Sequence, residues 1–116
     1  IFSHVPILSI AAQLSSSKSK SKEEQGFPFW EAHRDQVRLK NLFYKTGNVR
    51  LCLSGHVHYV DCVDYLGTKY LCNGAVSGNW WRSPIRLDEF PPVFTIVDLF
   101  DDGAISYQHI YYGFIS

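Results

Sequence analysis

The sequence predicts a layered α/β fold in which a mixed sheet with antiparallel hairpins carries a helix on one face. Three observations support this fold class: one segment with apolar residues at helical spacing, several short apolar runs typical of strands, and a strong hairpin turn signal between the last two runs. Apolar residues make up 46% and aromatic residues 16% of the 116-residue chain. This composition is typical of a globular domain, and the length suits one domain with a modest core.

The first element is the end of a buried strand, expected at residues 1–3, after which Pro6 and residues 7–14 lead away from the sheet. Residues 15–25 consist only of Ser, Lys, Glu and Gln. A segment without apolar side chains cannot bury a core, so we expect a mobile surface loop there. Its lysines could attract a phosphate-bearing ligand, but a solvated loop is the simpler interpretation.

A helix is expected over residues 30–45, ending near Gly47, because glycine suits the C-terminus of a helix. The apolar residues of this segment form two stripes at helical spacing, the first of Ala32, Leu39, Leu42 and Phe43 and the second of Trp30, Val37 and Tyr44. Two apolar stripes predict that the helix has contacts on two sides.

Strands are expected in five further runs of the sequence: residues 49–54, 59–66, 69–72, 93–100 and 104–112. The second and third runs are joined near Gly67, and the last two by the hairpin signal Asp-Asp-Gly at 101–103. Between the two hairpins, residues 73–92 are rich in Gly, Pro and Trp, which predicts a long irregular loop. Such loops in compact domains are usually functional.

Charge and hydropathy disfavour two classes of partner. The formal net charge is zero and no basic stripe is visible, so neither nucleic acid nor an acidic membrane surface is indicated. No apolar run approaches the roughly 18 residues needed to span a bilayer. The cellular compartment stays open, since the cytoplasm and a bacterial periplasm are both compatible with the sequence.

The three cysteines, Cys52, Cys62 and Cys72, lie ten residues apart and form no C-x-x-C pair, so zinc-finger spacing is absent. Their odd number favours reduced thiols. We expect them to be small buried side chains in strands. A cross-strand contact between Cys62 and Cys72 is possible if the turn near Gly67 closes a hairpin.

Two histidine motifs follow apolar runs and predict a metal centre. His56 and His58 lie in the G-H-V-H motif at 55–58, and they would point the same way if the backbone stays extended. Gly55 would let the backbone come close to whatever they bind. His4 follows the apolar start of the chain, and Pro6 stiffens the exit from that strand. Imidazole binds zinc, iron and manganese, so strand-end histidines at two places indicate hydrolytic metal chemistry.

Other polar and aromatic residues allow more than one interpretation. His33 is expected on the surface of the helix, and His109 is expected to pack or lie exposed in the last strand. Trp80 and Trp81 could form an aromatic plug at the sheet edge or the wall of a ligand pocket. In the second case Arg82 could bind a phosphate oxygen, because a guanidinium group suits that geometry.

These motifs resemble those of a known family. I-F-S-H-V-P at 1–6 and L-S-G-H-V-H at 53–58 resemble the last two metal-binding motifs of the calcineurin-like metallophosphoesterases. That superfamily includes purple acid phosphatases, protein phosphatases and bacterial phosphodiesterases. The segment C-N-G-A-V-S-G-N-W-W at 72–81 also resembles a region of bacterial members, where a strand runs into a loop near the site. The resemblance covers most of this chain but only the C-terminal half of the family's domain.

The resemblance implies a fold and a metal site. Residues 1–116 would form the C-terminal portion of a four-layer α/β/β/α metallophosphoesterase sandwich. His4 and His56 would ligate one metal ion and His58 a second, the ions being Mn, Fe or Zn. A metal-bound hydroxide would attack phosphorus, and the two ions would clamp the attacking and leaving oxygens.

The resemblance also implies that the chain hydrolyses phosphomonoesters or phosphodiesters when complete. Substrate contacts would fall on Asn73, Trp80, Trp81 and Arg82. A small-molecule phosphate ester is the expected substrate.

The sequence departs from the family pattern because the D-x-H, G-D-x-x-D and G-N-H-[DE] motifs are absent. Those motifs supply the bridging aspartate, other ligands and the histidine that protonates the leaving group. We therefore expect no catalytic acid in this chain. Because the chain begins at Ile1 without a methionine, we expect the upstream half of the domain to be its partner. The chain alone should be inactive, although its parent is expected to be a hydrolase. Two alternatives are a non-catalytic metal- or ligand-binding module derived from the fold and a structural β-rich domain with incidental histidines.

Overall fold

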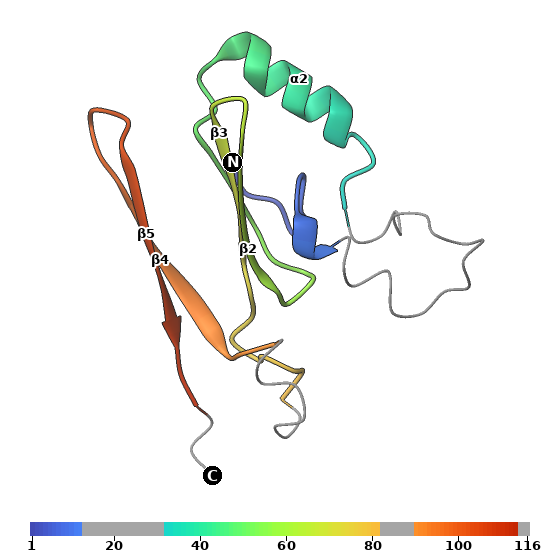
Figure 1. The fold of residues 1–116 in the computed structure, drawn as a ribbon, viewed down its shortest axis with the longest axis vertical. Coiled ribbons are helices and arrows are strands. Elements are labelled where there is room, and N and C mark those ends of the chain that lie inside the picture. Colours follow the sequence, from blue (N-terminus) through green and yellow to red (C-terminus); the bar gives the residue numbers. More distant parts are fainter. Residues whose placement is uncertain (13–31, 82–89, 114–116) are drawn as a thin grey trace, which may run out of the picture.

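The computed structural model describes residues 1–12, 32–81 and 90–113. Its named elements are the helix α2 (Gln36–Thr46) and the strands β1 (Leu51–Ser54), β2 (Val60–Tyr65), β3 (Thr68–Asn73), β4 (Val93–Leu99) and β5 (Ile105–Tyr111). Residues 10–12 are also helical. The strands form a three-stranded sheet in the order β1-β3-β2 and a two-stranded sheet of β4 and β5. In Figure 1 the β4–β5 hairpin, the three-stranded sheet and α2 lie in successive layers. The protein is therefore a small mixed α/β fold with two sheets.

Helix α2 is shorter than the sequence predicts. The segment before it, residues 32–35, is not helical, and the backbone N–H of His33 donates to the carbonyl of Pro6 instead. Asp35 precedes the first turn without a side-chain capping bond. The predicted end is confirmed, because Gly47 has a left-handed backbone (φ +67°) and its N–H donates to the carbonyl of Phe43. Trp30 and the expected loop at 15–25 lie outside the described residues.

Only one side of α2 is covered by the described residues. Phe43 is buried and Leu39 packs beside it. The prediction that the second stripe is a contact face is wrong, because Val37 is 61% exposed and Tyr44 63% exposed. Leu42 is also half-exposed, since it turns away from the sheet that Phe43 contacts.

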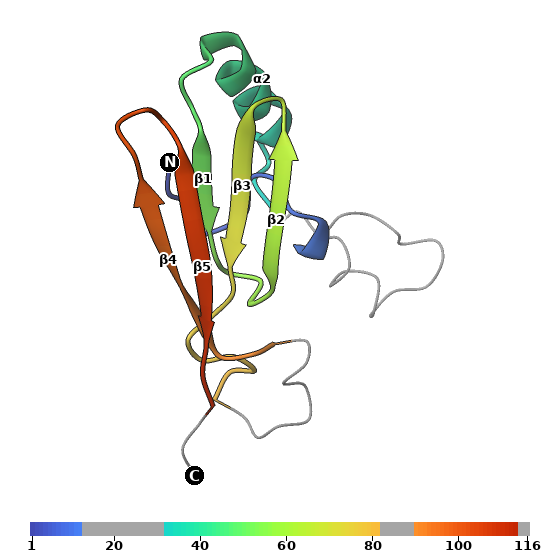
Figure 2. The same ribbon diagram turned by 60° about the vertical axis from the view of Figure 1, so that its left-hand side comes forward.

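The core lies between α2 and the three-stranded sheet. Cys52 pairs with Tyr70 across β1 and β3, and Tyr70 pairs with Val63 across β3 and β2, so the three side chains share one face. Ile7 and Phe43 pack on that face with Cys52 and Tyr70. Figure 2 shows β1, β3 and β2 side by side in front of the helix.

The first residues pair with β1, but they do not form the buried strand that the sequence predicts. Phe2 forms a parallel bridge to Leu53, and the backbone N–H of Ser3 donates to the carbonyl of Leu53 at 3.0 Å. Phe2 is nevertheless 84% exposed and Ile1 50% exposed. Among the described residues no strand lies beyond this edge, so these side chains lack the neighbour that would cover them.

The predicted hairpins are both present. Strands β2 and β3 are antiparallel and turn at Gly67, and β4 and β5 are antiparallel from Val93↔Tyr111 to Leu99↔Ile105. The D-D-G turn at 101–103 joins the second pair, with Gly103 at φ +84°. The β4–β5 hairpin lies over the sheet face opposite α2, where the ammonium group of Lys69 stands 5.5 Å from the Tyr107 ring.

A contact between Cys62 and Cys72 is ruled out by the register. Cys62 faces Leu71, and Cys72 faces Asp61. Because successive residues of a strand point to opposite faces, the two sulfur atoms lie on opposite sides of the sheet. All three thiols are free. Cys52 and Cys72 are buried as predicted, whereas Cys62 is only half-buried.

The predicted irregular loop begins one residue later than expected, because Asn73 still belongs to β3. Residues 74–81 and 90–92 carry no strand beyond a single bridge between Ala75 and Pro92, and residues 82–89 are not described.

No helix in the described part of the chain is long and apolar enough to cross a membrane.

Candidate functional site

The topology brings the predicted histidine motifs to one edge of the three-stranded sheet. Residues 1–3, β1 and β3 run parallel, so their carboxyl ends share that edge. The chain segments leaving these ends are bonded to one another. The N–H of Gly55 donates to the carbonyl of His4 at 3.1 Å, and the thiol of Cys72 contacts the carbonyl of Gly55 at 3.4 Å.

His4 and His56 lie in direct contact. Nε2 of His4 is 3.0 Å from Nδ1 of His56, and the two rings meet at 70° with their centroids 4.8 Å apart. This distance fits a single hydrogen bond between two neutral imidazoles. It also fits two neighbouring ligands of one octahedral ion, because bonds of about 2.1 Å at a right angle place two nitrogens about 3.0 Å apart, whereas a tetrahedral ion would place them about 3.4 Å apart.

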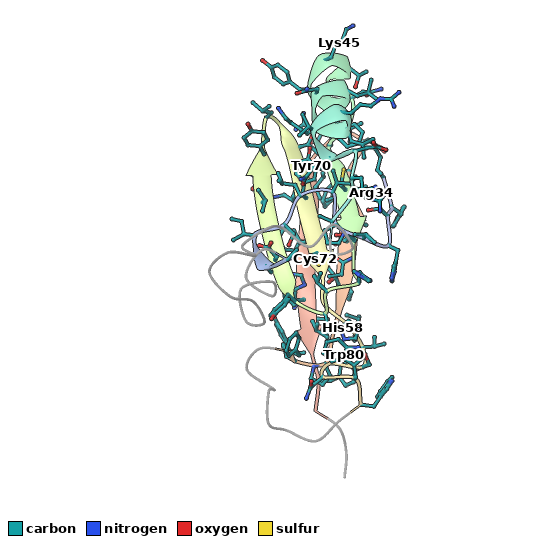
Figure 3. The ribbon with its side chains drawn as sticks, turned by 90° about the vertical axis from the view of Figure 1, so that its right-hand side faces the viewer. Arg34, Lys45, His58, Tyr70, Cys72 and Trp80 are labelled. Atoms are coloured by element: carbon teal, nitrogen blue, oxygen red, sulfur yellow. The ribbon has the colours of Figure 1, made fainter. Side chains whose placement is uncertain are left out.

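His58 is held in the tautomer that leaves Nε2 available to a metal ion. Its Nδ1 lies 2.8 Å from the carbonyl oxygen of Gly78. A carbonyl only accepts, so Nδ1 carries the hydrogen, and in the neutral ring the lone pair is left on Nε2. Metal-ligating histidines usually donate their other ring N–H in this way. Trp80 stacks on the same ring with centroids 4.2 Å apart and planes at 16°, and Figure 3 shows the two side chains together below Cys72.

The three predicted ligands do not form one cluster. His4 and His56 meet as a pair, and His58 is engaged separately with Gly78 and Trp80. Within the described ranges no group of three or more His, Cys, Asp or Glu residues is placed to hold a metal ion. Among the described residues, the three histidines thus form one contacting pair and one separate imidazole.

The expected extended backbone through the G-H-V-H motif is wrong. Strand β1 ends at Ser54, and His56 and His58 both have left-handed backbones, with φ +68° and +62°. Each such conformation costs a residue with a side chain about 1–2 kcal/mol. The turn is kept by Val57, which is buried against Ala12 and whose N–H donates to the carbonyl of the preceding glycine at 2.8 Å. The histidine side chains are therefore directed by a strained turn.

The glycine before the histidines is not tightly packed by the described residues. A Cβ on Gly55 would meet only the carbonyl of Gly74, at 3.9 Å, which is ordinary contact. The tightly packed glycines are Gly74 and Gly78. A Cβ on Gly74 would lie 2.4 Å from a methyl of Val93, and one on Gly78 would lie 2.8 Å from the carbonyl of Phe90.

Asn73 carries an unpaired acceptor near this edge. Its side-chain oxygen is buried, and no donor among the described residues reaches it. A buried amide oxygen without a partner is costly, so a ligand, an ion or a water molecule is the expected partner. Asn73 ends β3, beside the segment that carries the histidines.

Trp80 packs against other aromatic rings, and the role of the tryptophans as the wall of a ligand pocket stays a prediction. Trp80 packs on His58 and meets the edge of Phe90, with centroids 5.4 Å apart, yet 52% of its surface is exposed. Trp81 is 68% exposed. Arg82 lies outside the described residues, so its expected phosphate contact is not addressed by the structure.

The remaining histidines lie away from this edge. His109 sits in β5 with Nδ1 2.9 Å from the hydroxyl of Thr95, and burial lowers the pKa of His109. It packs between the rings of Tyr107 and Tyr111, as the packing interpretation expects. Sequence reasoning missed Gly78, the hydrogen-bond partner of His58. The resemblance predicted a loop near the site at residues 72–81, but it did not single out Gly78 as the partner of His58.

No family model, curated protein or solved structure matches this chain. The functional argument therefore depends on the geometry of these residues.

Proposed function

We propose that the chain carries part of the metal site of a phosphoesterase, as the C-terminal portion of a calcineurin-like metallophosphoesterase domain. The parent protein would hydrolyse phosphomonoesters or phosphodiesters. The observation that carries this proposal is the contact of 3.0 Å between His4 and His56 at the carboxyl edge of the sheet. Two imidazoles from distant parts of the chain converge there at a distance that suits ligands of one ion.

The residues divide into two groups. His4 and His56 would hold one ion, and Nε2 of His58 would face the second, because Gly78 occupies its Nδ1. Manganese, iron or zinc would suit these nitrogens. When bound, the ions would supply Lewis acidity toward the phosphoryl group. Asn73, with its unpaired side-chain oxygen, is the best placed candidate for a polar contact to substrate or to a ligand of the site.

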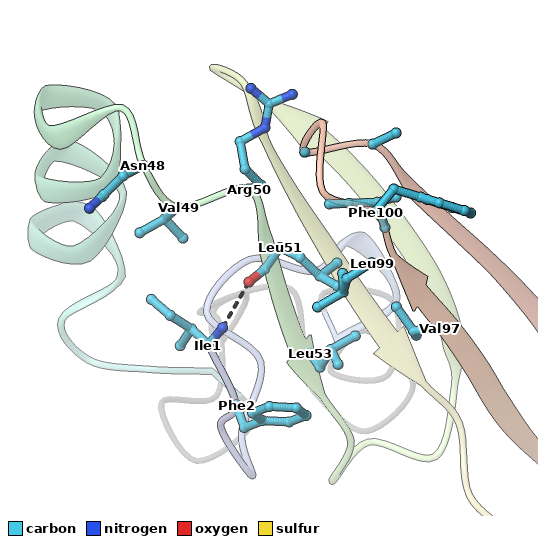
Figure 4. A pocket seen from close by; sticks show the side chains of 13 residues that line it. Ile1, Phe2, Asn48, Val49, Arg50, Leu51, Leu53, Val97, Leu99 and Phe100 are labelled. Atoms are coloured by element: carbon cyan, nitrogen blue, oxygen red, sulfur yellow. Dashed lines mark hydrogen bonds between the residues drawn. The ribbon is translucent and has the colours of Figure 1, made fainter.

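Three imidazoles do not complete the coordination of two ions. The missing carboxylates and the acid for the leaving group must come from another segment, and we propose that this segment is the upstream half of the same domain. An apolar cleft of about 450 Å³ between residues 1–2, β1 and the β4–β5 hairpin offers a place for it to pack. Figure 4 shows Ile1, Leu51 and Leu99 lining this cleft, with the amino group of Ile1 bonded to the carbonyl of Leu51.

Metal binding to the chain itself is the first test. Calorimetric titration with Mn²⁺ or Zn²⁺ should show binding that His4→Ala and His56→Ala each weaken at least tenfold. His33→Ala is the matched control, since it also removes one partly exposed imidazole, but on the segment before α2. Equal affinity in all variants would remove His4 and His56 from the site.

Turnover by the parent protein is the second test. With a chromogenic phosphoester, hydrolysis should depend on added manganese and should be lost in His4→Ala, His56→Ala and His58→Ala. The His33→Ala protein should keep its activity. A parent protein that binds metal at these histidines but shows no metal-dependent turnover would overturn the catalytic assignment.

A non-catalytic metal-binding module is the second candidate. The observation that favours it is that His58 stands apart from the His4–His56 pair, so the described residues offer an incomplete site. This candidate predicts metal binding without hydrolysis, and a parent sequence without the aspartates of the upstream motifs.

A further inference from the structure

We propose that Trp80 and Trp81 form an aromatic shelf that stacks against a planar ring in the alcohol portion of the substrate. The site would then select phosphoesters of nucleosides or other aromatic alcohols over those of simple alkyl alcohols or sugars. This inference rests on the proposed function, because it assumes that the phosphoryl group is bound beside His58.

The first observation is the exposure of the indole rings of two consecutive residues. Trp80 is 52% exposed and Trp81 68% exposed. Tryptophan is highly buried on average, and an exposed pair forgoes the stabilisation that burial would provide. Exposed aromatic side chains rimmed by polar groups are typical of a binding surface.

The second observation is the backbone that carries them. Trp80 and Trp81 have left-handed conformations, with φ +50° and +61°, which glycine would adopt at no cost. Each costs about 1–2 kcal/mol with a side chain. Strain of this kind persists where the surrounding structure enforces it and is concentrated at binding sites.

The shelf is held in place before any ligand arrives. The N–H of Trp81 donates to the carbonyl of Ser77 at 2.9 Å, and the N–H of Trp80 to that of Gly78 at 3.0 Å. Gly78 is packed so tightly against Phe90 that a Cβ would not fit. Since the loop is already ordered, binding of a stacking ligand causes little further loss of conformational entropy.

The third observation is the position of the shelf relative to the candidate metal ligands. One face of Trp80 covers the ring of His58 at 4.2 Å, and Phe90 meets its edge. The exposed half of Trp80 must lie on the part of the ring that neither His58 nor Phe90 covers. A substrate with its phosphoryl group at Nε2 of His58 therefore has its alcohol portion next to the shelf.

The test uses the indole N–H signals of the ¹⁵N-labelled chain in two-dimensional NMR. The three tryptophans give three signals, which are assigned with Trp30→Phe, Trp80→Phe and Trp81→Phe. Without metal, the chain is titrated with adenosine, with adenosine 5′-monophosphate and with ribose 5-phosphate. Adenosine and its monophosphate should shift the signals of Trp80 and Trp81 saturably, and ribose 5-phosphate should not.

A variant pair separates stacking from general effects on the loop. Trp81→Leu should weaken adenosine binding about tenfold, since base–aromatic stacking contributes about 1–3 kcal/mol, whereas Trp81→Phe should keep most of the affinity. Equal shifts with ribose 5-phosphate and adenosine, or shifts confined to Trp30, would overturn the shelf. The wild-type titrations decide this even if a variant fails to fold.

The outcomes for the shelf and for the phosphoesterase proposal can be told apart. Adenosine carries no phosphate and the titration contains no metal, so its binding reports on the shelf alone. Metal binding at His4 and His56 without any adenosine effect would overturn the shelf and leave the metal site. Adenosine binding without any metal binding would overturn the proposed function and leave an aromatic binding surface.

Discussion

The packing around Gly74 yields a prediction whose size can be worked out from the structure. Gly74 has φ +69°, and a Cβ there would lie 2.4 Å from a methyl of Val93 and 3.0 Å from one of Val60. Val93 is 1% exposed, and β-branched side chains have little rotamer freedom, so these methyls have nowhere to move. Gly74→Ala should therefore add an overpacking cost of about 1–3 kcal/mol to a conformational cost of about 1–2 kcal/mol.

Gly47 provides a matched control. Its φ of +67° is almost the same, but nothing lies within 4 Å of a Cβ built there. Gly47→Ala should lower the free energy of unfolding only by the conformational cost, about 1–2 kcal/mol. The difference between the two variants isolates the packing term.

Urea unfolding followed by circular dichroism measures the free energy of unfolding of both variants. Thermal midpoints should fall by about 4 °C per kcal/mol for a domain of this size. Gly74→Ala should be the less stable variant by about 1–3 kcal/mol. Equal losses would mean that Val93 and Val60 yield without cost, and the account of tight packing beside the histidine segment would be refuted.

Three further predictions concern single side chains. Burial lowers the pKa of His109 below its ordinary 6.5, so protonation favours the unfolded chain. The free energy of unfolding should fall as the pH drops through about 6.5 and level off below the lowered pKa, and His109→Gln should flatten that decline in urea titrations at several pH values. Burial raises the pKa of the Cys52 and Cys72 thiols, so a thiol reagent should label Cys62 first. A fast phase of labelling that remains in Cys62→Ser would contradict this. Asp61→Ala removes the acceptor of one hydroxyl and two backbone N–H groups of the N-terminal segment. It should lower the free energy of unfolding by about 2–3 kcal/mol. An unchanged urea midpoint would show that these hydrogen bonds contribute nothing to stability.

Local signals in the sequence predicted the strands and both hairpins well. The turn residues Gly67 and Gly103 and the alternation of apolar side chains act over a few neighbouring positions, so they can be read without the rest of the chain. The start of α2 was predicted too early. Ala32 has the spacing of a helical residue, but it is buried outside the helix, because the chain at His33 bonds to Pro6.

Burial was harder to predict than secondary structure. The apolar residues Val37 and Tyr44 suggested a second contact face, and Phe2 suggested a buried strand, yet all three are exposed. An apolar pattern shows what a side chain could cover, but only the arrangement of the other elements shows whether anything lies there.

The sequence alone determined the strand-end positions of His4, His56 and His58, because apolar runs and turn residues mark where strands stop. Tertiary structure decided how these side chains are used. The parallel pairing of residues 1–3 with β1 brings His4 to within 3.0 Å of His56, although 52 positions separate them. The left-handed turn at His58 and the carbonyl of Gly78 select its Nδ1–H tautomer. Long-range pairing and a strained turn depend on contacts between distant segments, and no local pattern encodes them.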